Sequence, residues 1–122
     1  MKPLLIIIAL LLWPHTANAD VLPKSMHGEW ATDLAACAEQ ASEIKMTVEP
    51  KSVLFYEHGY EIRRVARLKD GSLKASGFSV ADDGRARGAI TLKLLSVDTL
   101  QAGGQIYQRC KAEKQNRTKP KG

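Results

Sequence analysis

The most constraining feature of this 122-residue chain is a series of short segments in which apolar and polar residues alternate. In the segment from Ile44 to Val48, every second residue is apolar, as in a strand with one face on a core and the other in water. Asp70-Gly71, between two later segments, is a strong signal for a tight hairpin turn. The pattern predicts strands over residues 29–32, 44–48, 52–57, 60–69, 73–80, 86–97 and 100–110.

Short strands joined by tight turns, with no helix of ordinary length, predict an all-β domain. We expect a small antiparallel up-and-down barrel of seven to eight strands. Gly77, Gly88 and the pair Gly103-Gly104 fall inside predicted strands, where glycine permits the bends and bulges that closure of a barrel requires. Asp33 is expected to cap one brief helical turn after the first strand.

The amino terminus has the pattern of a secretory signal peptide over residues 1–19. Lys2 is followed by an apolar run from Leu4 to Trp13 and by the small-residue site Ala17-Asn18-Ala19. The run is shorter than the roughly 20 residues that span a bilayer, so we expect a periplasmic protein that begins at Asp20 and does not span the membrane. A retained membrane anchor is the alternative.

Two cysteines, Cys37 and Cys110, are expected to form one disulfide, because thiols tend to pair in an oxidising compartment. Because the two cysteines are far apart in the sequence, their disulfide would close a long loop and stabilise the fold by roughly 4 kcal/mol. Free or intermolecular thiols are the alternative. In a single last strand, Leu100, Ile106 and Cys110 share one face, so Cys110 is expected to point towards the core.

The carboxyl-terminal residues 111–122 are predicted to be a disordered basic tail, which leaves 20–110 as the single domain. The whole chain has a formal net charge of +5, and much of the excess lies in this tail. A solubilising role is expected, and weak contact with an anionic surface such as envelope lipid is the alternative. Nucleic acid is not an expected partner outside the cytoplasm.

Gly28-Glu29-Trp30 resembles the Gly-x-Trp signature of the lipocalin and wider calycin barrels. The resemblance implies that Trp30 packs across the closed end of the barrel. It also implies that an arginine at the end of the last strand, here Arg109, lies on the indole ring. Such a contact contributes about 0.5 to 2 kcal/mol.

The chain from Pro23 to Lys111 is also similar to a class of small, secreted proteobacterial proteins of uncharacterised function. That resemblance implies location and fold but no activity. A fainter resemblance, in size, location and Gly-x-Trp start, is to periplasmic inhibitors of bacterial metalloproteases. The motifs shared with the secreted class are Gly28 to Trp30, Cys37, Phe55-Tyr56-Glu57 and Tyr107 to Cys110.

Residues typical of enzymes are sparse, so we expect no catalytic activity, no metal and no cofactor. His27 and His58 lack a third ligand at recognisable spacing and are expected to be surface histidines. Glu57 and Glu61 flank a tight turn and could act as an acid–base pair, although solvated turn charges are commoner.

The mouth of the barrel is the usual place for a ligand site in such folds. Arg64 shares a strand face with Ile62, and a planar guanidinium there could bind a carboxylate or phosphate. The alternatives are that Arg64 forms a structural salt bridge or that the register of its strand is shifted. Candidate lining residues are Phe55, Leu92, Leu94 and Ile106.

We therefore expect a non-catalytic periplasmic protein that binds a small apolar, amphipathic or anionic ligand. The alternative is an inhibitor or protein-interaction module that binds an envelope protein through its surface or its amino-terminal arm, Asp20 to Met26.

Overall fold

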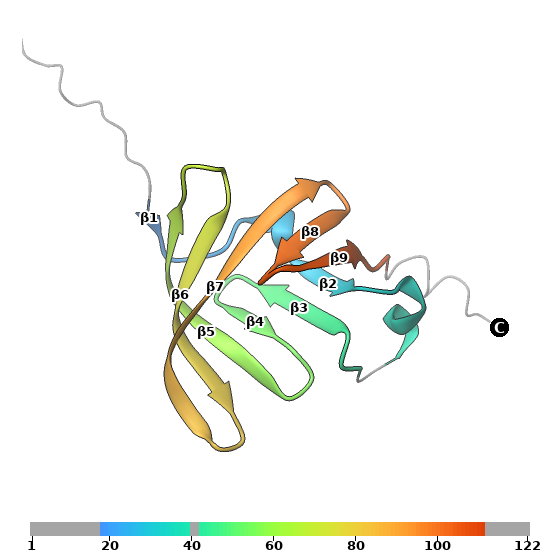
Figure 1. The fold of residues 1–122 in the computed structure, drawn as a ribbon, viewed down its shortest axis with the longest axis horizontal. Helices are drawn as coiled ribbons and strands as arrows, with labels where there is room; N and C mark the ends of the chain where they lie inside the picture. The colour runs from blue at the N-terminus through green and yellow to red at the C-terminus, as the bar shows by residue number, and fades with distance from the viewer. Residues whose placement is uncertain (1–17, 40–41, 112–122) are drawn as a thin grey trace, which may run out of the picture.

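The computed structural model describes residues 18–39 and 42–111, and in Figure 1 they form one rolled-up sheet. Within these ranges, no helix is long and apolar enough to cross a membrane. The elements are β1 (Asn18–Ala19), η2 (Lys24–Met26), β2 (Gly28–Ala31), η3 (Leu34–Ala38), β3 (Lys45–Glu49), β4 (Ser52–Leu54), β5 (His58–Arg67), β6 (Leu73–Ala81), β7 (Gly84–Ser96), β8 (Thr99–Ala102) and β9 (Gln105–Arg109); η2 and η3 are short 3₁₀ helices.

The strands β2 to β9 form a closed eight-stranded barrel. Each strand pairs antiparallel with the next one along the chain, and β9 returns to pair with β2. The predicted all-β, antiparallel up-and-down barrel is therefore confirmed. The short β1 adds to β5, where Asn18 lies opposite Ala66. The predicted tail lies outside the described residues except for Lys111, and so does the predicted signal peptide except for Asn18-Ala19.

The predicted last strand is two strands, β8 and β9. Gly103 and Gly104 connect them with positive φ angles of 56° and 96°, the conformation of a two-residue hairpin turn. The turn changes which side chains face inward, because Leu100 and Tyr107 become buried partners while Ile106 is 44% exposed. The prediction that Ile106 faces the interior is therefore wrong.

The interior of the barrel is filled by apolar side chains. Trp30 and Leu92 are fully buried within it. Leu22 and Met26, from the segment before β2, pack into the same core, and the Leu22 N–H donates to the Pro50 carbonyl at 2.8 Å. The predicted amino-terminal arm is therefore part of the barrel from Leu22 onward and does not project from it.

A β-bulge in β5 decides where its arginines point. The register against β6 shifts between Ile62 and Arg64, which leaves Arg63 as the extra residue. As a result Ile62 and Val65 are both buried, whereas Arg63 and Arg64 are both exposed. The expectation that Arg64 shares the inner face with Ile62 is therefore wrong, and the shifted register is the reason.

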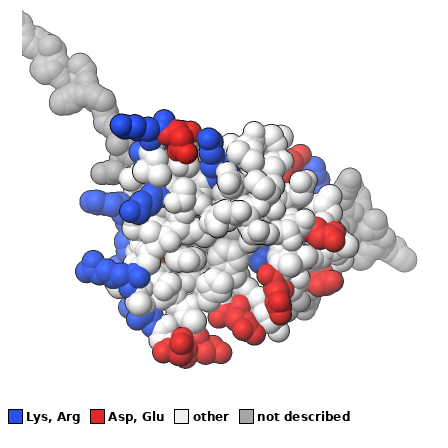
Figure 2. Space-filling view, viewed as in Figure 1, with Lys and Arg blue, Asp and Glu red and all other residues white. Residues whose placement is uncertain are grey.

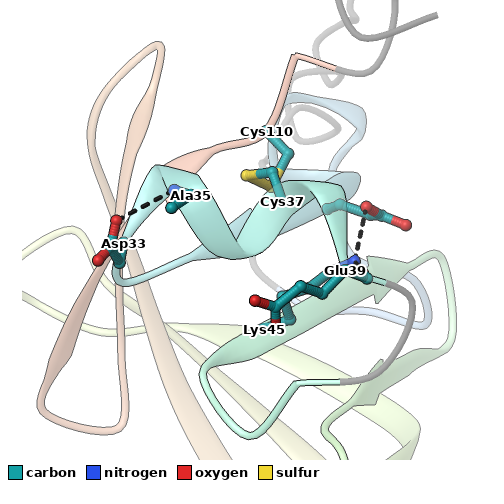
Figure 3. Close-up of a disulfide and its surroundings, with 7 residues drawn as sticks. Asp33, Ala35, Cys37, Glu39, Lys45 and Cys110 are labelled. Atoms are coloured by element: carbon teal, nitrogen blue, oxygen red, sulfur yellow. Dashed lines mark hydrogen bonds and ion pairs between the residues drawn. A yellow bond between two sulfur atoms is a disulfide. The ribbon is translucent and has the colours of Figure 1, made fainter.

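The disulfide lies outside the barrel, beside the seam between β2 and β9. The Asp33 carboxylate accepts a hydrogen bond from the Ala35 N–H at 3.0 Å and so caps η3, as predicted. The η3 helix carries Cys37, which is bonded to Cys110 with a Cα–Cα distance of 5.6 Å (Figure 3). The predicted pairing is confirmed, but Cys110 joins a separate buried cluster with Ala31 rather than the barrel core.

Candidate functional site

One end of the barrel is closed by Trp30 and Arg109. These residues are opposite partners in β2 and β9, and the Arg109 guanidinium carbon lies 4.3 Å from the centroid of the indole ring. The structure thus places Arg109 where the resemblance to calycin barrels implies. The indole N–H donates to the Met26 carbonyl at 3.0 Å, so the ring is also held by the segment that covers this end.

The guanidinium of Arg109 joins its own strand, β9, to two other segments at the closed end. Its Nη1 donates to the His27 carbonyl at 3.0 Å, and its Nη2 donates to the carbonyls of Ser25 and Val97, each at 2.8 Å. The Asp98 carboxylate lies 3.3 Å from its Nε. These contacts hold the segment before β2 and the turn between β7 and β8 against β9, which closes this end of the barrel.

The opposite end is open where β7 separates from β8. The last residue pair between these strands is Leu92 with Ala102, and the turn from β8 to β9 follows at once. A pocket of about 640 Å³ lies at this opening. Its lining includes an apolar and aromatic wall, made by Phe55, His58, Tyr60, Ile90, Ala102 and Tyr107, and a polar lip, made by Asp70, Ser72, Lys93 and Gln101.

Three rings form the centre of the pocket wall. Phe55 stacks on His58 with a centroid distance of 4.7 Å and an interplanar angle of 14°. Tyr60 meets both rings edge-on, at 6.4 Å from Phe55 and 6.1 Å from His58. Phe55 and Tyr60 pack against the core yet stay half-exposed, so the cluster presents an aromatic surface to the pocket.

Polar groups on the lip and the wall differ in their charge. Asp70 accepts hydrogen bonds from the Ser72 hydroxyl at 2.6 Å and the Ser72 N–H at 2.9 Å, which lower the pKa of its carboxyl below the ordinary value. Burial raises the pKa of the Tyr107 phenol, which is therefore neutral at physiological pH. An aromatic wall beside hydrogen-bonding groups suits an amphipathic molecule.

The aromatic wall continues beyond the main pocket. A second hollow of about 440 Å³ shares His58 and Tyr60 with it and extends along β6 and β7 past Ser79 and Ala86. Ser79 and Ala86 are opposite partners near the end of the β6–β7 hairpin. The two hollows therefore adjoin each other at His58 and Tyr60.

The residues proposed from sequence as ligand contacts are scattered. Phe55 lines the pocket, whereas Leu92 is buried in the core and Leu94 is partly buried against it. Ile106 lies on the outer surface and Arg64 lies in a groove on the outside of the sheet. Sequence reasoning missed His58, Tyr60 and Tyr107. Aromatic residues around one tight turn were a usable signal for His58 and Tyr60, whereas Tyr107 belongs to β9.

Two of the other candidate residues, His27 and Glu61, have structural partners. The His27 Nε2 lies 2.8 Å from the Leu22 carbonyl oxygen. Glu61 pairs with Arg85 at 2.7 Å, so one member of the suggested acid pair is held in an ion pair. Among residues 18–39 and 42–111, no three His, Cys, Asp or Glu side chains are grouped so that they could hold a metal ion.

Comparisons of the chain with protein-family models, with curated proteins and with solved structures give no match.

Proposed function

We propose that this protein is a non-catalytic binding protein that takes a small amphipathic ligand at the open end of its barrel. The observation that carries the proposal is the cluster of exposed His58 with partly buried Phe55 and Tyr60 on the wall of a 640 Å³ pocket. Pockets for small molecules are commonly about 300–1,000 Å³ and combine apolar surface with a few polar groups. The ring cluster provides the apolar surface here, and Asp70, Lys93 and Tyr107 provide the polar groups.

The ligand lies at the mouth and not deep inside the barrel, because buried side chains such as Leu92 and Leu100 already fill the interior. This location favours a molecule with a flat apolar part that stacks on the rings and a polar part that reaches the lip. The alternative, inhibition by a projecting amino-terminal arm, is disfavoured because Leu22 and Met26 are buried in the core.

We place this function in the periplasm or another extracellular compartment. The disulfide between Cys37 and Cys110 is compatible with an oxidising environment. The sequence pattern of residues 1–19 supports export, with a mature chain that begins at Asp20. Ala19 is exposed, so its removal with the signal peptide would take no side chain from the barrel interior.

A titration with the neutral fluorescent probe N-phenyl-1-naphthylamine tests the proposal. We expect saturable binding with one probe per chain. The Phe55→Ala variant should bind the probe about tenfold more weakly, because aromatic stacking contributes about 0.5 to 1.5 kcal/mol beyond the apolar area that the ring buries. Tyr56→Ala is the matched control, because Tyr56 is the adjacent aromatic residue and is 50% exposed outside the pocket. Equal binding by both variants, or no saturable binding, would refute the proposed site.

A further inference from the structure

The outer face of β5, β6 and β7 holds a second concave site, on the side of the sheet opposite to the ring cluster. It is an open groove of about 620 Å³ whose charged lining residues are all basic. Figure 2 shows Lys and Arg gathered along the edge where Figure 1 places these strands, whereas Asp and Glu lie mainly along other edges. The basic lining residues are Arg63, Arg64, Lys74 and Arg87.

The bulge in β5 builds this groove. Without the register shift between Ile62 and Arg64, alternation would send one of two consecutive arginines into the core. With the bulge, Arg63 and Arg64 are both exposed on the outer side. Bulges commonly redirect a side chain next to a functional site. The opposite strand has Gly77 at this point, where an added Cβ would lie 1.9 Å from the Glu61 carbonyl oxygen.

The strand register brings the basic side chains together over β6. Arg64 is opposite Ser76, and Arg87 is opposite Phe78 on the other side of the same strand. Ser76 and Phe78 are two residues apart and share the outer face of β6, and neighbouring strands lie about 4.8 Å apart. Arg64 and Arg87 therefore flank the groove from opposite sides, with long side chains that can reach one anion between them.

In the part of the chain that the structure describes, three of these cations lack an acidic partner. Arg85 is neutralised by Glu61 at 2.7 Å, and Arg63 lies 3.7 Å from the same carboxylate. Within the described ranges, no carboxylate lies within 4.0 Å of the side-chain nitrogens of Arg64, Lys74 or Arg87. The two arginines that share Glu61, Arg85 and Arg63, also lie over the ring of Phe78, with guanidinium carbons 4.2 and 5.3 Å from the ring centroid.

We propose that this groove is a phosphate-binding site, independent of the ligand site at the barrel mouth. Several uncompensated cations around one hollow favour an anion with more than one negative charge and several acceptor oxygens. Guanidinium groups match phosphate oxygens through two parallel hydrogen bonds, and the ammonium group of Lys74 adds a point charge. The phosphate group belongs either to a soluble compound or to a lipid headgroup.

The test measures binding of two probes by the full chain. Calorimetry reports binding of inorganic pyrophosphate, and sedimentation reports binding to phosphatidylglycerol vesicles against phosphatidylcholine vesicles. The test variant is Arg64→Gln with Arg87→Gln, and the control is Lys24→Gln with Lys51→Gln, which removes the same charge from exposed positions outside the groove. Both variants keep residues 111–122, so any contribution of that segment to anion binding is the same in the two.

We expect the test variant to bind at least about tenfold more weakly than the control, because it loses both guanidinium groups that flank the groove. Loss of pyrophosphate binding identifies a soluble phosphate compound as the source. If the wild-type chain does not bind pyrophosphate, and the test variant loses binding to phosphatidylglycerol vesicles, the source is a lipid headgroup. Equal binding of both probes by the two variants, or no binding of either probe, overturns the proposal.

Discussion

The guanidinium carbon of Arg109 lies 4.3 Å from the centroid of the Trp30 ring, and the two residues are opposite partners in the strands that close the barrel. Gly28, at the start of the same strand as Trp30, has a φ of 124°, and a Cβ added there would lie 3.6 Å from the Arg109 Nη1. The backbone there needs glycine, because other residues rarely adopt this conformation. At the closed end of the barrel, the stacked cation therefore also holds two segments to β9 through its hydrogen bonds.

Replacement of Arg109 by lysine should destabilise the fold by about 2 kcal/mol. Lysine keeps the positive charge but cannot reproduce the planar set of hydrogen bonds to the carbonyls of Ser25, His27 and Val97. Urea unfolding measures the change in the free energy of unfolding. Arg67→Lys, at an exposed position, is the control and should change that free energy by less than about 0.5 kcal/mol. Equal effects of the two substitutions would contradict the role of Arg109.

Reduction of the disulfide should lower the free energy of unfolding by about 4 kcal/mol. Cys37 and Cys110 are 73 positions apart, and opening so long a loop restores much of the entropy of the unfolded chain. Urea unfolding with and without dithiothreitol measures the effect. The variant with Cys37→Ala and Cys110→Ala should be insensitive to the reductant, and a wild-type chain that is equally insensitive would contradict the prediction.

Leu22→Ala should destabilise the barrel by about 2 to 5 kcal/mol, because it opens a cavity in the core. Leu22 is 1% exposed, whereas its neighbour Val21 is 43% exposed. Val21→Ala is therefore expected to change the free energy of unfolding by less than about 0.5 kcal/mol. Thermal unfolding followed by circular dichroism compares the two, and a similar loss for both would show that the segment does not pack as described.

The free energy of unfolding should fall in alkaline solution because of the buried phenol of Tyr107. Burial raises the pKa of Tyr107 in the folded state above its ordinary value of 10.0, so the unfolded chain loses the phenolic proton first. The free energy of unfolding should therefore fall as the pH rises above about 10. Tyr107→Phe should lessen this fall, and Tyr56→Phe, at an exposed position, should retain it. Urea unfolding at a series of pH values measures both, and identical profiles would contradict the prediction.

Gly77→Ala should destabilise the fold by about 1 to 3 kcal/mol or more, because the new Cβ would lie 1.9 Å from the Glu61 carbonyl oxygen. Backbone at that point must shift, which disturbs the bulge that turns Arg64 outward. Ser76→Ala, at the adjacent position of β6, is the control. Urea unfolding followed by circular dichroism measures the free energy of unfolding. An unchanged value for Gly77→Ala would show that Gly77 does not lie close to the Glu61 carbonyl.

The sequence by itself determined the class of the fold and its covalent link. Alternation with a period of two is a local property of each strand, and the turn residues that separate the strands are local as well. Two cysteines allow only one internal pairing. For these reasons the antiparallel barrel, the capped turn at Asp33 and the disulfide could be predicted without tertiary information.

Only the tertiary structure decided which side chains face the interior and where the pockets lie. A shift of one residue moves a side chain to the other face of a strand. The turn at Gly103-Gly104 moved Ile106 outward, and the bulge at Arg63 did the same for Arg64. The ring cluster and the basic groove depend on the register in which neighbouring strands pair, and alternation along a single strand does not determine that register.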